Sequence, residues 1–183
     1  RYAEGAGIAV TQAEKDDYVA HLQASLQSDR KEQATRRAEL HRQLASGEPG
    51  ETERRSLTAQ IEALDQLLAS LDALAEENVR NPEETRAARD EVAGAFIRQW
   101  KINRALYREF GGRIIFQQGG PEPLDAYRRF LEASQARGDF EITNRDLEAA
   151  FWRYYRTDEI HSFFTPGSRE EAQAFDAPWW ESQ

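Results

Sequence analysis

Residues 82–110 constrain the fold of this chain more than any other stretch. Their apolar stripe repeats at spacings of four, three, four and three, and it consists of Phe96, Trp100, Asn103, Tyr107 and Phe110. Such spacing places side chains on one face of an α-helix, and Ile97 and Leu106 widen that face. Pro82 suits the first helical turn, and the glycine pair at 111–112 can supply the left-handed residue that ends a helix. The sequence therefore predicts a long central helix with an aromatic face that other segments cover.

Two amphipathic helices are predicted before this central helix. Thr11 and Glu14 match a capping box, in which each side chain satisfies an otherwise unpaired backbone N–H. The first helix begins there and ends in a Gly-Pro loop at residues 46–50. The second has a heptad seam formed by Leu57, Ile61, Leu64, Leu68, Leu71 and Ala75. Because the loop is short, residues 11–77 are expected to form a long antiparallel hairpin. It either projects beyond the core or belongs to a bundle.

Residues 82–183 are expected to form an aromatic-rich core of the central helix and shorter C-terminal helices. The segment 113–118 is β-branched and aromatic and lies between two glycine pairs, but no second run pairs with it. We therefore expect an extended segment packed on helices. Trp179 and Trp180 are expected to dock on the domain, the alternative being a partner-binding tail. The predicted fold is all-α, as a single helical domain of residues 1–183.

Composition excludes several classes of protein. The net charge of -9 argues against a general nucleic-acid binder. Most of the excess lies in residues 1–91, which have 19 acidic and 12 basic side chains. No run of about 18 apolar residues occurs, so no membrane-spanning helix is predicted. The absence of cysteine excludes a disulfide framework and a thiolate metal site.

The chain also contains one basic stripe, although its net charge is negative. It lies on a flank of the central helix and consists of Arg98, Lys101, Arg104 and Arg108. Ion pairing with the acidic first half, or solvation, explains such a stripe. An anionic ligand is the alternative.

The sequence contains no recognisable catalytic motif. Of the three histidines, only His161 has an acid, Asp158, at the three-residue spacing that places two metal ligands on one side of a helix. A solvated or core-edge histidine is the favoured interpretation of this single pair. Cysteine is missing, no serine stands in a Gly-x-Ser-x-Gly turn, and no glycine pair belongs to a phosphate-binding loop. We expect no enzyme, no cofactor and no metal.

The stretch 7–22 begins with a glycine turn and continues into the capped helix. It resembles the N-terminal chaperone domain of SurA-type periplasmic folding factors and related parvulin-type prolyl isomerases. The positions that match that family are Gly7, Ile8, Val10, Thr11, Glu14, Asp16 and Val19. Lys15 departs from it, because the family usually has an aliphatic residue there.

The resemblance implies a bacterial, exported, mostly helical protein that holds unfolded or extended polypeptide in an apolar groove without a cofactor. No parvulin catalytic domain is present, so isomerase activity is not implied. The family has a helix before this turn, which fits a chain that starts at Arg1. A cleaved leader or an N-terminal membrane anchor is therefore expected before Arg1, and the expected location is the periplasm or cell envelope.

The predicted function is a chaperone-like polypeptide-binding module. Its groove would be lined by aromatic residues, the candidates being Trp100, Tyr107, Phe116, Trp152 and Tyr155. For each of them the alternative is an ordinary core position. A second hypothesis is an interaction protein, either an envelope assembly subunit or an immunity-type inhibitor, that binds one folded partner through the acidic hairpin. An enzyme that uses Asp158 and His161 is the third hypothesis.

Overall fold

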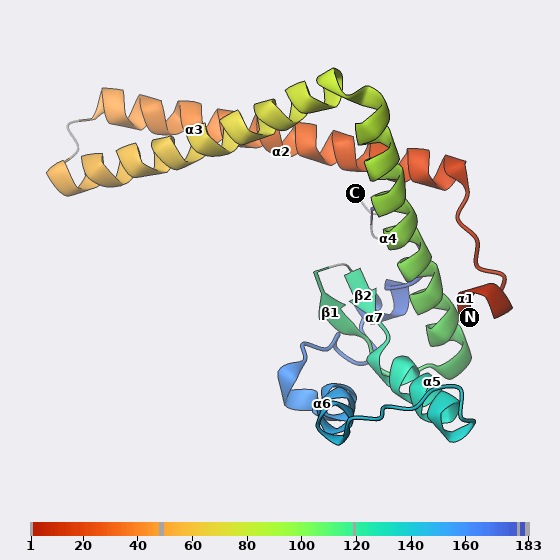
Figure 1. Cartoon of the computed structure of the whole chain (residues 1–183). Coiled ribbons are helices and arrows are strands. Elements are labelled where there is room, and N and C mark those ends of the chain that lie inside the picture. The colour runs from red at the N-terminus through yellow and green to blue at the C-terminus, as the bar shows by residue number, and fades with distance from the viewer. Residues whose placement is uncertain (1, 48–49, 119, 179, 182–183) are drawn as a thin grey trace. The chain divides into compact units, whose positions relative to one another are not determined.

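The computed structural model describes residues 2–47, 50–118, 120–178 and 180–181. It is 74% helical, with seven α-helices and one small two-stranded sheet in this part of the chain, which confirms the all-α prediction (Figure 1). The helices are α1 (Tyr2–Gly5), α2 (Gln12–Ser46), α3 (Glu51–Arg80), α4 (Pro82–Phe110), α5 (Leu124–Ala136), α6 (Arg145–Arg156) and α7 (Arg169–Gln173). A 3₁₀ turn spans Asp158–Ile160, and the strands are β1 (Ile115–Gln117) and β2 (Gly120–Glu122). None of the described helices is both long and apolar enough to cross a membrane.

The chain divides into two compact units. Residues Asp16–Ala93 form the first, called here the hairpin unit, and residues Arg1–Lys15 with Gly94–Gln183 form the second, called the aromatic unit. Helices α2 and α4 each contribute residues to both units. The loop residues Glu48 and Pro49 lie outside the described residues.

The hairpin unit consists mainly of α2 and α3, which run antiparallel side by side (Figure 1). The ion pairs show the direction: Arg30 pairs with Asp72 at 2.7 Å, while Arg37, further along α2, pairs with Asp65, which comes earlier in α3, at 2.8 Å. Between the helices, Leu40 packs in a buried cluster whose α3 members are Leu57, Ile61 and Leu64. The predicted seam therefore faces α2 over this stretch.

The helix starts follow the capping signals of the sequence. At the start of α2 the Thr11 backbone N–H donates to Glu14 Oε2 at 2.8 Å, and the Glu14 N–H donates to Thr11 Oγ1 at 3.2 Å. Asn144 Oδ1 accepts from two backbone N–H groups at the start of α6, at 2.9 and 3.1 Å. Ser168 Oγ accepts from the third residue after it at 3.1 Å, at the start of α7. These side chains satisfy donors that a helix leaves unpaired.

The most buried positions of α4 in the aromatic unit are Ile97 and Leu106, each 1% exposed, whereas Phe96 is 40% exposed. The stripe prediction was therefore wrong about Phe96 as a core residue. Asn103 is buried within the stripe because both polar atoms of its amide are hydrogen-bonded: Oδ1 accepts from Gln99 and Tyr127 at 2.8 Å each, and Nδ2 donates to a backbone carbonyl at 3.0 Å. A buried amide satisfied in this way does not destabilise the core.

The segment after α4 forms a strand, which corrects the expectation of an unpaired extended segment. Strand β1 pairs antiparallel with β2, with Ile115 opposite Glu122. On its other side, Phe116 N–H donates to the Ser162 carbonyl at 2.8 Å. Sequence reasoning missed the partner because β2 is Gly-Pro-Glu, which has low strand propensity. Gly119, of the second glycine pair, lies outside the described residues.

The C-terminal segment packs on α4. Trp180 is 8% exposed and meets Trp100 edge to face, with ring centroids 6.0 Å apart. For Trp180 the docking prediction is confirmed, whereas Trp179 lies outside the described residues.

Candidate functional site

An apolar groove between α5 and α6 is the candidate functional site. Its volume is about 690 Å³, and its lining residues are Leu131, Phe140, Ile142, Leu147, Ala150 and Phe151. Leu131 belongs to α5, the last three belong to α6, and the other two belong to the connection between the helices. All six side chains are apolar, so this groove can bind another apolar group but offers no chemistry of its own.

The local sequence explains why the groove lies here. Gly138, with a φ of +78°, lets the chain turn at the end of α5, and Asn144 caps the start of α6. The α6 lining residues Leu147, Ala150 and Phe151 are spaced by three and four, which places them on one face of the helix. Turn, cap and spacing together direct an apolar face towards Leu131.

Polar contacts hold the two helices together around the groove. Gln135 Nε2 donates to Glu148 Oε1 at 3.0 Å, and Arg156 pairs with Glu132 at 2.9 Å. Aromatic rings pack along α6 next to the groove. The centroid of the Phe151 ring lies 5.1 Å from that of Trp152 and 5.3 Å from that of Tyr155. The groove is therefore built on packed helices.

The segment that connects α5 to α6, together with the first turn of α6, carries an acidic bias. The segment 137–148 contains four carboxylates, Asp139, Glu141, Asp146 and Glu148, against two arginines. One arginine, Arg137, is held by Asp139 at 2.9 Å. This bias favours an occupant whose apolar part is flanked by basic groups.

The five aromatic residues predicted to line a groove do not form one surface. Trp152 is buried and Tyr155 is half-buried; both lie beside the groove residue Phe151 but do not line the groove. Burial raises the pKa of Tyr155 to about 12, and the nearby Glu122 charge adds to this. Trp100 is buried against Trp180.

The other two candidates belong to a different cluster of the aromatic unit. Tyr107 packs on Phe175, with ring centroids 5.1 Å apart, next to Ile114 and Phe164. Phe116 stacks on Phe164 at 4.0 Å and is 62% exposed. Sequence reasoning did not single out Leu147 or Phe151 and missed the groove. Their helical spacing can be read from the sequence. Whether another segment covers them cannot be read from the residues around them.

The third hypothesis was an enzyme that uses Asp158 and His161. These two side chains are held by different partners. Both Asp158 oxygens accept from Arg113, at 2.7 and 3.0 Å, whereas His161 Nε2 lies 2.7 Å from the Tyr154 carbonyl. Within the described ranges no group of three or more His, Cys, Asp or Glu side chains is placed to hold a metal ion. The pair is not assembled as a joint ligand set.

Arg113 also binds the buried carboxylate of Asp125. Its Nε donates to Asp125 Oδ2 at 2.9 Å and its backbone N–H donates to the same oxygen at 3.0 Å. Burial opposes ionisation of Asp125, but the bonds and charge of Arg113 outweigh it, so the pKa of Asp125 lies below its usual value. The guanidinium stacks over Phe163 at 4.4 Å. This cluster fixes the start of α5 and the segment after α4.

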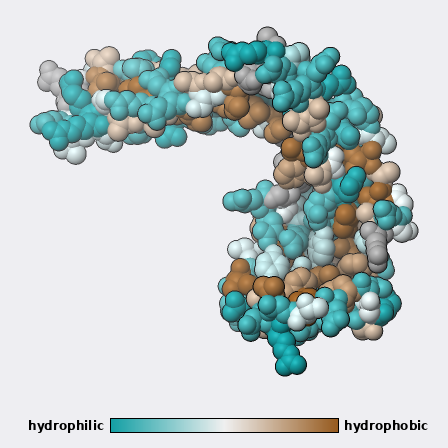
Figure 2. Space-filling view, in the orientation of Figure 1, coloured by the Kyte–Doolittle hydropathy of each residue, from teal (hydrophilic) through white to brown (hydrophobic). Residues whose placement is uncertain are grey.

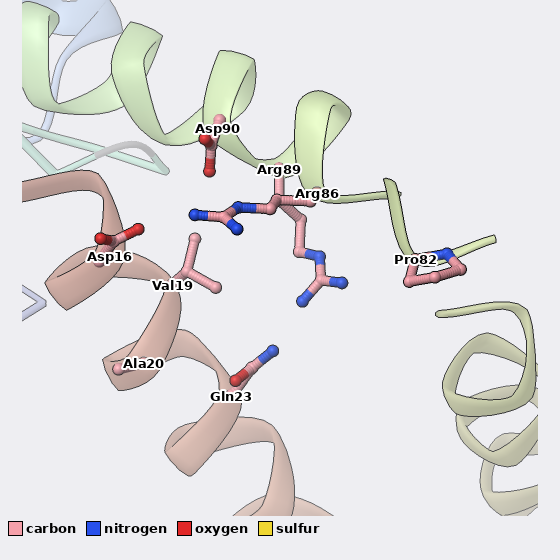
Figure 3. Close-up of a pocket in the computed structure, with 8 residues that line it drawn as sticks. All are labelled: Asp16, Val19, Ala20, Gln23, Pro82, Arg86, Arg89 and Asp90. Atoms are coloured by element: carbon pink, nitrogen blue, oxygen red, sulfur yellow. The ribbon is translucent and has the colours of Figure 1, made fainter. Parts of the chain in front are cut away.

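A pocket of about 300 Å³ in the hairpin unit has a different character. Arg86 and Arg89 of α4 point into it, with Asp16 of α2 and Asp90 of α4 as the carboxylates (Figure 3). Figure 3 shows one of the two guanidinium groups lying between the Asp16 and Asp90 carboxylates and the other directed towards Gln23. Two positive and two negative side chains leave this pocket without net charge, and most of its lining is polar.

Comparisons with protein-family models, with curated proteins and with solved structures found no match to this chain.

Proposed function

We propose that this chain is a non-catalytic, chaperone-like polypeptide-binding helical module of the bacterial cell envelope. Its α5–α6 groove would bind apolar segments of unfolded or extended polypeptide. The observation that supports this proposal is the groove itself, of about 690 Å³ with six apolar lining residues and an exposed leucine, Leu147, at 63% exposure.

The chemistry of the groove suits a client of loosely defined sequence. Burial of one Leu- or Phe-sized side chain contributes about 1.5–3 kcal/mol. Two or three such side chains, less the cost of ordering an unfolded segment, correspond to weak and reversible binding. Among the described residues, those that line the groove are all apolar, so it would select apolarity and not a particular residue. The acidic segment 137–148, which supplies three of the lining residues, would add a preference for basic flanking residues.

The envelope location rests on the resemblance of residues 7–22 to SurA-type factors. The structure gives that stretch a left-handed Gly7, with a φ of +65°, followed by the capped start of α2. These are features of a good helix start, and they say nothing of the client. The groove is the part of the proposal that experiment can test directly.

An aggregation assay tests the proposal. A denatured outer-membrane-type protein is diluted into buffer with the chain near one-to-one, and light scattering is followed. We expect the native chain to suppress aggregation and Leu147→Asp to lose this effect. Leu74→Asp in the hairpin unit is the matched control, because Leu74 is also 63% exposed, and it should remain active. Absence of suppression with several clients, or equal activity of Leu147→Asp, would contradict the proposal.

A second candidate function is binding of one folded partner through the acidic hairpin, as in an envelope assembly subunit or an immunity-type inhibitor. The observation that favours it is exposed apolar area on α3, where Leu67 is 44% and Leu74 is 63% exposed. Figure 2 shows brown, apolar side chains among teal, hydrophilic ones along the hairpin. Under this hypothesis Leu74→Asp would abolish capture of the partner in a pull-down, and Leu147→Asp would not.

A further inference from the structure

A second pocket of the aromatic unit lies along the basic flank of α4. Its volume is about 460 Å³, and three of the four cations of the basic stripe line it: Lys101, Arg104 and Arg108. The fourth, Arg98, does not line it. Ile8, from the turn before α2, lies opposite α4, and Pro178 comes from the C-terminal segment. This pocket shares no lining residue with the apolar groove, so it is a separate site.

Only one of the three cations is neutralised within the pocket. Lys101 Nζ binds Glu14 Oε1 at 2.5 Å and the Ala9 carbonyl at 2.7 Å. Partial burial opposes ionisation of Glu14, but the hydrogen bonds from Lys101 and Thr11 outweigh it, and the pKa of Glu14 lies below its usual value. In the described part of the chain, neither Arg104 nor Arg108 has a carboxylate within ion-pair distance.

Two N–H donors of the pocket residues lack an acceptor. Trp100 is 93% buried, at 7% exposure, and its Nε1 has no hydrogen-bond partner among the residues that the structure describes. The same holds for the buried Nε of Arg104. An unsatisfied buried donor is costly, and native proteins rarely tolerate two of them side by side. The Arg104 guanidinium lies 5.1 Å above the Trp100 ring, so both groups are held in one place.

We propose that this pocket binds a small organic anion with an apolar body. The guanidinium groups of Arg104 and Arg108 would bind the anionic head, because their planar forks match the oxygens of a carboxylate or a phosphate. The two arginines are one helical turn apart, so both reach the same side of α4. The Trp100 ring, Ile8 and Pro178 would contact the body, since a volume of about 460 Å³ exceeds that of an inorganic ion.

Titration calorimetry with four probes tests this proposal. Phenylbutyrate and phenylbutyl phosphate each combine an anionic head with the same apolar body; phenylbutanol has the body alone, and inorganic phosphate has the head alone. We expect one or both organic anions to bind, and the two single-feature probes to bind at least about tenfold more weakly. The preferred head identifies the source, a free carboxylic acid or a phosphate ester. Equal binding of phenylbutanol, or of inorganic phosphate, would overturn the proposal.

Two glutamine variants of α4 test whether the organic anion binds in this pocket. Arg108 is exposed, so Arg108→Gln should fold normally and bind the organic anion about tenfold more weakly, because one charge-assisted contact is lost. Arg98→Gln is the matched control on the same helix and should bind like the native chain. The indole N–H resonance that disappears in Trp100→Phe should shift on titration of the native chain. Equal affinities of the two glutamine variants, or an unmoved indole resonance, would show that the anion binds elsewhere and would refute the assignment.

Discussion

Replacement of Arg113 by methionine should destabilise the aromatic unit because it leaves the buried charge of Asp125 with only the more distant Arg128 as a cationic partner. The Asp125 side chain is 7% exposed and accepts from the Arg113 Nε at 2.9 Å. Methionine keeps an unbranched apolar stem but removes the charge and the side-chain donors. The variant therefore removes the ion pairs of Arg113 with both Asp125 and Asp158, of which only the Asp125 side chain is buried.

The magnitude follows from the exposure of the two partners. Loss of one partner of a fully buried ion pair costs about 3–5 kcal/mol. The Arg113 side chain is 36% exposed, and Arg128 remains 3.5 Å from Asp125, so both reduce the loss. We expect a decrease of about 2–4 kcal/mol in the free energy of unfolding at pH 7.

The pH dependence gives the sign of the effect. In the native chain the pKa of Asp125 lies below its usual value, so its stabilisation is present above the unfolded-state pKa of about 3.9 and is lost as the pH falls through the folded value. Without Arg113, burial is opposed mainly by the more distant Arg128, so the pKa of Asp125 should rise, and protonation then removes the poorly compensated charge. The stability difference between the two proteins should therefore shrink as the pH falls from 7 towards about 4.

Urea unfolding followed by tryptophan fluorescence measures this difference. Arg137→Met is the control, because its pair with Asp139 is exposed, at 59% and 52%, and should contribute less than about 1 kcal/mol. The reasoning would be refuted if Arg113→Met cost no more than Arg137→Met, or if its cost stayed constant between neutral and acidic pH.

Four further substitutions test backbone conformation, packing and helix capping. Gly112→Ala should cost at least about 2 kcal/mol, because its φ is +100° and the new Cβ would lie 2.4 Å from the Asp125 Cβ. Gly111→Ala has the φ strain but no neighbour within 4 Å, so it should cost about half as much. Urea unfolding of both variants measures the two costs. Ile61→Ala should remove about 2–4 kcal/mol from the hairpin unit, measured as an earlier loss of helical circular dichroism. Asn144→Ala should cost about 1 kcal/mol through loss of the α6 cap, and an unchanged urea midpoint would contradict that role.

The helices could be predicted because their signals are local. The Thr11–Glu14 capping box and the Asn144 cap both lie within four residues of the N–H groups that they satisfy. The seam of α3 could be read from its period, and Leu57 and Ile61 face α2 as expected. Each of these features depends only on residues close to one another along the chain.

The pairing of β1 could not be predicted, because β2 has no strand signal and Phe163, which forms a bridge to Ile115, comes 48 positions later. The burial of Asn103 has the same origin. Its acceptor is satisfied by Tyr127, a residue 24 positions away. The residues next to Ile115 and Asn103 in the sequence do not indicate these distant partners.

The sequence by itself determined that the chain is helical, where its principal helices begin, and that its charge and residue types leave no recognisable catalytic motif. Tertiary structure alone decided which apolar residues are core and which line a surface. Trp152 and Leu147 belong to the same helix, yet one is buried and the other is 63% exposed. The physical reason is that burial depends on which neighbouring segment covers a side chain, whereas helix formation depends on spacing and capping within one segment.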